Sequence, residues 1–197
     1  MDEPTTRRPH ETIHGGSRIK CFSKRLISKA TVMNTNGAVI TEAVKNTIYK
    51  ACLFLDNEKW DDFLGLCDQN FKYAIKAYSP EISRDMTYFS GNQADLKTLV
   101  EMLPKHNTDH SPLKRHATVY TVDVEQNGTD AKAVTSLVVY QNLFDGINSH
   151  IDAGENRLFL IGNYIDKFKV HKKSATFVER EVRLDTRSLS KGSHFIV

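Results

Sequence analysis

Four long segments with a period of two residues fill the second half of the chain and restrict its fold more than any other feature. They cover residues 116–125, 131–142, 158–170 and 176–184. Alternating apolar and polar side chains are typical of a strand that buries one face, and Gln126-Asn127-Gly128 is a hairpin signal. The pattern predicts an antiparallel meander. Because strands usually have about 3–10 residues, strands this long favour a strongly curved sheet.

The first half of the chain is mainly helical in its spacing of apolar residues. The predicted elements are a helix with Thr41 as N-cap, a helix at 57–67, strands at 71–78 and 86–89, and a helix at 95–103 that Pro104 ends. Two consecutive amphipathic helices favour an αα unit that packs on a flat layer. We therefore expect an α+β fold in which three N-terminal helices lie on the concave side of a strongly curved antiparallel sheet and form a cone.

Residues 1–36 differ from the rest of the chain and are left out of this predicted fold. They are rich in Arg and Lys, with Ser, Thr and Gly and little periodicity. One interpretation is a basic targeting arm, but Glu3 and Glu11 argue against it because such arms are poor in acids. The others are a disordered N-terminal extension and a segment that is not translated, with Met33 as the initiator. The folded domain is expected to cover 37–197.

The composition is that of a globular protein and argues against two classes of partner. Of the 197 residues, 40% are hydrophobic and 26% are charged, and the formal net charge is +3. Lys and Arg are mixed with acidic residues after the N-terminal segment, so we expect no binding of nucleic acid. There is no run of about 18 apolar residues, so we expect no membrane span. Three cysteines without a CxxC motif, Cys21, Cys52 and Cys67, favour a reducing cytoplasm.

Several local strings in 40–197 resemble the small (β) subunits of aromatic-ring-hydroxylating, Rieske-type non-haem iron oxygenases. The strings are Trp60-Asp61-Asp62-Phe63, Tyr78-Ser79-Pro80-Glu81, Arg115-His116, Ser136-Leu137-Val138-Val139-Tyr140 and Arg180-Glu181-Val182-Arg183-Leu184-Asp185-Thr186. Within the family, 105–110 and 190–194 are most similar to the branch that acts on methanesulfonate. The resemblance implies the cystatin-like cone shared with nuclear transport factor 2.

The resemblance also implies partners and places the cofactors outside this chain. Small subunits of this family assemble with a large (α) subunit, in an α3β3 hexamer in which the small subunits also contact one another as a trimer. The large subunit carries the Rieske [2Fe-2S] cluster and the mononuclear iron. Electrons from NADH arrive through a reductase and a ferredoxin. This chain is then a structural small subunit of a mono- or dioxygenase.

The cysteines and histidines of this chain do not fit either iron site. A Rieske centre needs two Cys and two His in paired short motifs, whereas these cysteines are 31 and 15 residues apart. A mononuclear iron site needs two His and a carboxylate, and the candidates are His106, Asp109, His110 and His116. Because Pro104 and Pro112 bracket them, a polar loop is favoured. We therefore predict no catalytic, cofactor-binding or metal-binding residue in this chain.

An alternative function is a stand-alone isomerase, cyclase or dehydratase with an Asp–His pair as general base in the cone. The available pairs are Asp109 with His116 and Asp85 with His110. An enzyme of this kind needs an open cavity, whereas a structural subunit has a filled one. The bulky side chains of Trp60, Phe63, Phe71 and Tyr73 favour filling.

The predicted interface residues are Arg115, His116, Arg183 and Asp185. The segment 131–142 is apolar on both faces, which favours a strand covered by its own helices on one side and by another chain on the other; burial within one domain is the alternative. The charged residues of 179–185 on one face suit either a solvated surface or paired charges between subunits. The apolar string 194–197 predicts burial against the same or another chain.

Overall fold

The computed structural model describes residues 19–106, 111–144, 154–186 and 196–197, and their side chains from Asn36 onward except that of His106. The chain divides into two units, residues 1–36 and Gly37–Val197. The second unit contains the sheet and all the side chains discussed below. Whether residues 1–36 form a disordered extension stays a prediction.

Three helices are present among the described residues: α1 (Ile19–Asp56), α2 (Trp60–Leu64) and α3 (Gln93–His106). Thr41 lies inside α1, so the predicted N-cap is wrong; no proline interrupts the chain between Ile19 and Thr41, and the helix is continuous there. The second helix is shorter than predicted because the strand after it already begins at Cys67. Pro104 lies inside the last turn of α3, which ends two residues after it.

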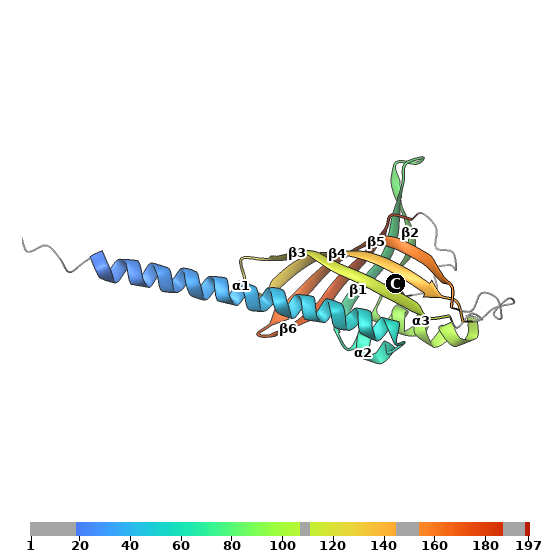
Figure 1. Ribbon diagram of the computed structural model, residues 1–197, viewed down its shortest axis with the longest axis horizontal. Coiled ribbons are helices and arrows are strands. Elements are labelled where there is room, and N and C mark those ends of the chain that lie inside the picture. Colours follow the sequence, from blue (N-terminus) through green and yellow to red (C-terminus); the bar gives the residue numbers. More distant parts are fainter. Residues whose placement is uncertain (1–18, 107–110, 145–153, 187–195) are drawn as a thin grey trace, which may run out of the picture. The chain divides into compact units, whose positions relative to one another are not determined.

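Six strands of the described chain form one sheet in the order β2-β1-β6-β5-β4-β3. The strands are β1 (Cys67–Ser79), β2 (Arg84–Asn92), β3 (Leu113–Val124), β4 (Asp130–Asn142), β5 (Asn156–His171) and β6 (Ser174–Leu184). The predicted meander of the last four strands is confirmed. Between β1 and β6 the pairing is parallel, which joins the first hairpin to the meander. Figure 1 shows these long strands curving as they pass one another.

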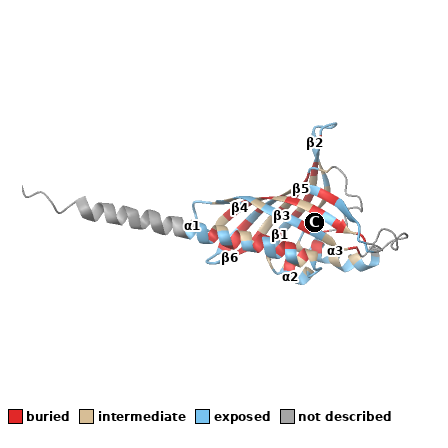
Figure 2. Ribbon diagram, in the orientation of Figure 1, coloured by how far each residue is buried: buried red, intermediate tan, exposed pale blue. Residues whose placement is uncertain are grey.

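The core lies between the concave face of the sheet and the helices. One face of α1 supplies Val44, Ile48 and Ala51, all fully buried, and the sheet supplies aromatic side chains such as Phe168 and Phe177, whose ring centroids lie 4.6 Å apart. Figure 2 shows buried residues along the sheet and on the helix faces turned toward it. The predicted α+β cone, with helices packed on a curved sheet, is therefore what the structure shows.

Gly162, near the middle of β5, lies against the backbone of β6 with no room for a side chain. A Cβ atom added there would lie 2.2 Å from the carbonyl oxygen of Arg183 on β6, and backbone cannot yield as the end of a side chain can. We expect Gly162→Ala to lower the free energy of unfolding by about 2–3 kcal/mol, the cost of overpacking. Urea unfolding followed by circular dichroism measures this change.

Gly37→Ala is the matched control. Gly37 lies inside α1 with no atom within 4 Å of an added Cβ. Alanine is preferred to glycine in a helix by about 1 kcal/mol, so this variant should be as stable as the original chain or slightly more so. Equal stability of the two variants would show that β5 and β6 can separate at Gly162 without cost.

Candidate subunit interface

Apolar side chains gather on the outer face of β4 and β5, opposite the helices, where the polar pair Ser136 and Asn163 interrupts them. We define the outer patch by three cross-strand pairs of side chains: Val134 with Ile165, Val138 with Ile161, and Tyr140 with Leu158. Tyr140, Leu158, Ile161 and Ile165 are 36–50% exposed although they lie on central strands. The prediction that β4 is apolar on both faces is confirmed, since its other face carries the buried Leu137 and Val139.

Polar residues border the outer patch on both sides. On β3, His116 pairs with Val138 and packs edge-on against Tyr140, with 5.7 Å between ring centroids. On the β6 side, Arg183 pairs with Asn163 of β5, and the backbone N–H of Asp185 donates to the carbonyl of Ile161. An apolar centre with a polar rim is the usual composition of a protein–protein interface. Three of the four predicted interface residues, His116, Arg183 and Asp185, therefore lie around one patch; their role in an interface stays a prediction.

The rest of the outer face, over β6, β1 and β2, carries charges that pair within the chain. Lys167 and Glu179 lie 2.8 Å apart, and Arg183 contacts Glu181 at 2.9 Å and Asp85 at 2.7 Å. Partial burial raises the pKa of Glu181, but hydrogen bonds from Lys76 and Arg183 outweigh it and hold the pKa below its ordinary value. Exposed ion pairs such as Lys167 with Glu179 contribute little stability.

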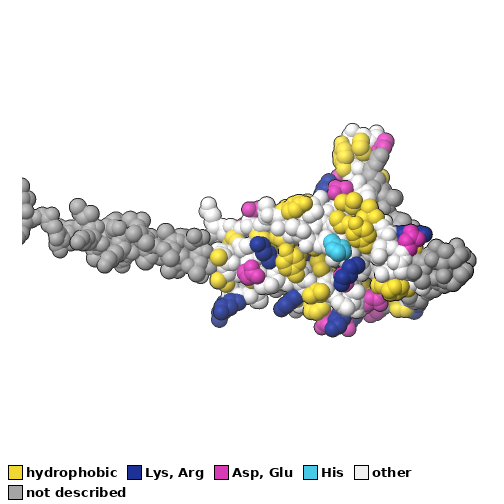
Figure 3. All heavy atoms as spheres, in the orientation of Figure 1, with side chains coloured by type: hydrophobic (Ala, Val, Ile, Leu, Met, Phe, Trp, Pro, Cys, Tyr) yellow, Lys and Arg dark blue, Asp and Glu magenta, His cyan; other side chains and the backbone are white. Residues whose placement is uncertain are grey.

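Both signs of charge are mixed over the face of the molecule drawn in Figure 3, so that face shows no basic stripe.

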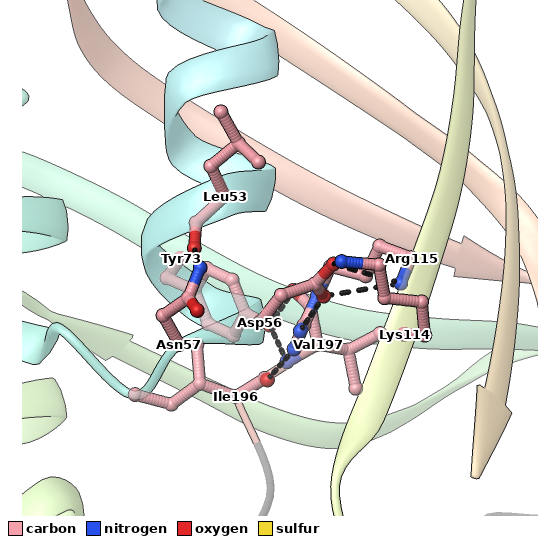
Figure 4. A network of polar contacts seen from close by, with 8 residues as sticks. All are labelled: Leu53, Asp56, Asn57, Tyr73, Lys114, Arg115, Ile196 and Val197. Atoms are coloured by element: carbon pink, nitrogen blue, oxygen red, sulfur yellow. Dashed lines mark hydrogen bonds and ion pairs between the residues drawn. The ribbon is translucent and has the colours of Figure 1, made fainter. Parts of the chain in front are cut away.

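Arg115, the fourth predicted interface residue, lies inside the cone. Its guanidinium Nη1 donates to Asp56 Oδ1 at 2.9 Å and its Nη2 donates to the carbonyl of Ile196 at 2.7 Å (Figure 4). The backbone N–H of Arg115 also donates to Asp56, which ties the end of α1 to β3. Burial alone would lower the pKa of Arg115, but Tyr164 and Asp56 beside it raise the pKa above its ordinary value. Arg115 on β3 thus connects the end of α1 with residues 196–197, which are called the tail below.

A second buried ion pair crosses the concave face between β5 and β6. Arg180 on β6 donates from Nε and Nη2 to the two carboxylate oxygens of Asp166 on β5, at 2.8 and 2.9 Å. Its Cζ lies 3.9 Å from the ring centroid of Tyr164 and 4.5 Å from that of Phe177. Burial alone would lower the pKa of Arg180, but the charge of Asp166 raises it, so the guanidinium stays protonated. The pair is fully enclosed by protein.

The structure does not assemble an iron site or a catalytic Asp–His pair from the residues it describes. Among the side chains that the structure describes, which do not include His106, no group of three His, Cys, Asp or Glu is placed to hold a metal. His116 is exposed on the outer face and Asp85 is paired with Arg183. Asp109 and His110, which belong to the predicted loop and to the two predicted pairs, lie outside the described residues.

The bulky side chains predicted to favour a filled cone lie in or against the core. Phe63, Phe71 and Tyr73 are at most 1% exposed, and Trp60 packs against the core. Cys52 and Cys67 are buried free thiols, and burial raises the pKa of Cys67 to about 12. Among the described helices none is long and apolar enough to cross a membrane.

Comparison with known proteins identifies the fold and the family. No family model matches the chain. Among solved structures, it resembles a β subunit assigned to an aromatic-ring-hydroxylating dioxygenase of Novosphingobium aromaticivorans, with a TM-score of 0.62 and 19% identity over 79% of this chain and 98% of the other. The benzoate 1,2-dioxygenase β subunit of Burkholderia mallei gives a TM-score of 0.53 and 13% identity over 78% of this chain and 95% of the other. An NTF2-like protein of Novosphingobium aromaticivorans with a cystatin-like fold gives a TM-score of 0.50 and 14% identity over 93% of this chain and 100% of the other, so the fold is the cystatin-like cone.

Sequence similarity narrows this class of fold to a family. The chain is 57% identical over 154 residues to the β subunit of the methanesulfonate monooxygenase hydroxylase of Methylosulfonomonas methylovora, covering 78% of this chain and 85% of the relative. It is 25% identical to the 2-aminobenzenesulfonate 2,3-dioxygenase β subunit of an Alcaligenes species, over 78% and 97% of the two chains. The chain belongs to the family of β subunits of multicomponent oxygenases that includes the methanesulfonate monooxygenase and ring-hydroxylating dioxygenase subunits. The predicted resemblance is confirmed, and the family implies a large α subunit as partner.

Proposed function

We propose that this chain is the structural β subunit of a Rieske-type oxygenase and binds its large α subunit through the outer patch. The observation that carries the proposal is the exposure of Tyr140, Leu158, Ile161 and Ile165 on central strands of a sheet whose other face is already covered. Apolar side chains gathered on an exposed face mark an interaction surface. The rim residues His116, Arg183 and Asp185 then set the register of the contact.

The redox groups of the assembly belong to the large subunit in this proposal. The three cysteines of this chain have the wrong spacing for a Rieske cluster, and the described Cys52 and Cys67 are buried in the core. When bound in the α subunit, the Rieske cluster and the mononuclear iron supply electron transfer and oxygen activation. Electrons reach them from NADH through a reductase and a ferredoxin. The residues of this chain hold the α subunits in place and influence substrate choice only indirectly.

The assembly we propose is an α3β3 hexamer in the cytoplasm in which the β subunits also meet as a trimer. Free buried thiols are typical of proteins in a reducing compartment.

For the substrate of the assembly we propose a small organosulfonate, with methanesulfonate as the first candidate. The proposal rests on the names of the two curated relatives, which act on methanesulfonate and on 2-aminobenzenesulfonate.

Co-expression tests this function directly. The tagged chain is produced alone and together with the large oxygenase subunit of the same organism, and each preparation is sized by light scattering and analysed for iron. We expect a colourless, iron-free protein when it is alone and a brown complex with equal amounts of both chains when it is co-expressed. An isolated chain that binds iron or oxidises a substrate unaided would contradict the proposal, as would a large subunit that never co-purifies with it.

A further inference from the structure

The residues Ile196 and Val197 are deeply buried although they lie far along the chain from the elements around them. They are 1% and 0% exposed and belong to the main hydrophobic core. The prediction that this apolar string is buried is therefore confirmed for these two residues, and the contact is within the same chain. His194 and Phe195 lie outside the described residues.

Polar groups of the sheet hold the backbone of these two residues in a defined way. The Tyr73 hydroxyl donates to the carbonyl of Val197 at 2.9 Å and accepts from its N–H at 3.0 Å. Arg115 Nη2 donates to the carbonyl of Ile196 at 2.7 Å (Figure 4). Burial raises the pKa of Tyr73 to about 12, which keeps the hydroxyl protonated. The sheet therefore binds these two residues as it could bind a small ligand: their side chains are buried in the core, and Tyr73 and Arg115 hydrogen-bond their carbonyl oxygens.

Further buried donors near this contact have no hydrogen-bond partner among the described residues. They are Nε of Arg115, the hydroxyl of Tyr164 and Nη1 of Arg180. The ring of Tyr164 lies against Arg180, and the charge of Arg115 acts on its hydroxyl. Leaving a buried donor unpaired costs about 1–3 kcal/mol. The interior therefore offers more donors than the tail uses, and it complements a ligand rich in oxygen acceptors.

We propose that Tyr73 and Arg115 form an interior binding site for a short branched aliphatic carboxylate, which Ile196 and Val197 occupy in this chain. The aliphatic part of such a ligand takes the place of the two side chains. Its carboxylate accepts from the Tyr73 hydroxyl and from Arg115 Nη2, while Arg115 Nη1 stays hydrogen-bonded to Asp56. The site is distinct from the outer patch, because Tyr73 and Arg115 lie on the concave face of the sheet.

Competition between the tail and a free carboxylate tests the site in the full chain. Ile196→Cys places a thiol in the site, and iodoacetamide labelling located by mass spectrometry reports when the tail leaves it. We expect millimolar 3-methylbutanoate to raise the labelling rate at position 196 several-fold with saturation, and 3-methylbutan-1-amine to leave the rate unchanged. A rate that does not respond to the carboxylate, or responds equally to the amine, would overturn the proposal.

A vacated site provides the second measurement. In the I196G/V197G variant of the chain we expect 3-methylbutanoate to raise the melting temperature by several degrees through mass action, and the original chain, in which Ile196 and Val197 compete for the site, to respond less. Adding Tyr73→Phe to this variant should abolish the shift, because the phenyl ring keeps the packing and removes the hydroxyl. An equal shift in the original chain, or an undiminished shift with Phe at position 73, would show that binding lies elsewhere.

Discussion

Asp166→Ala is expected to lower the free energy of unfolding by about 3–5 kcal/mol, the largest loss of stability we predict. The variant leaves the Arg180 guanidinium charged, fully buried and without its bidentate partner. Removing one member of a buried ion pair costs this much because the remaining charge is neither solvated nor paired. Chemical unfolding monitored by tyrosine and tryptophan fluorescence gives the value.

The matched control removes both charges and keeps the volume. Asp166→Leu combined with Arg180→Met replaces the pair by apolar side chains, a change that is often neutral or stabilising elsewhere. We expect the double variant to recover most of the stability that the single variant loses. A double variant as unstable as Asp166→Ala would mean that shape at this position, and not an unpaired charge, causes the loss.

Leu158→Glu is expected to weaken binding of the large subunit by about 30- to 1,000-fold. A charge inside an interface must be desolvated on binding, and the residues that dominate binding contribute about 2–4 kcal/mol each. Leu158 is 50% exposed in the single chain, so the substitution should change its stability little. Titration of the tagged variant against the large subunit by biolayer interferometry measures the loss.

Leu53→Glu is the corresponding control on another face. Leu53 is 55% exposed on α1, and the substitution adds the same charge to a side chain of similar exposure. We expect it to bind the large subunit as the original chain does. Loss of binding in both variants, or in Leu53→Glu alone, would place the interface away from the outer patch.

The periodicity of the sequence is sufficient for the fold class because the buried face of each long strand keeps a two-residue period over many residues. The apolar stripe of α1 is likewise readable from Val44, Ile48 and Leu55. The period fails at β-bulges, which a local pattern does not show. In β3 the register shifts between Val119 and Thr121. Because of that shift, Val119 and Val122 both pack against the core, although a strict two-residue period would place them on opposite faces.

The candidate site is only partly predictable from the sequence. His116, Arg183 and Asp185 border one patch, but the sequence cannot show this because it depends on which strands are neighbours. Arg115 is expected from the sequence to contact a partner and instead turns inward, where Asp56 at the end of α1 is 2.9 Å away. No local signal links two residues so far apart along the chain.

The buried pair of Arg180 and Asp166 is absent from the predictions although the sequence carries a signal for it. Arg180 alternates with Glu179 and Glu181, which places it on the same face as the buried Val182 and Leu184. Asp166 shares its face with the buried Tyr164 and Phe168 in the same way. Two residues of opposite charge, each within an apolar face, indicate a buried pair once their strands are known to be neighbours.

Photo-crosslinking from the outer patch tests most directly the claim that this surface binds the large subunit. p-Benzoylphenylalanine is introduced in place of Leu158 or, as control, of Leu53, and the co-expressed complex is irradiated and analysed by mass spectrometry. We expect a covalent adduct between position 158 and the large subunit, and none from position 53. No adduct from position 158, or an adduct only with a second copy of this chain, would contradict the claim.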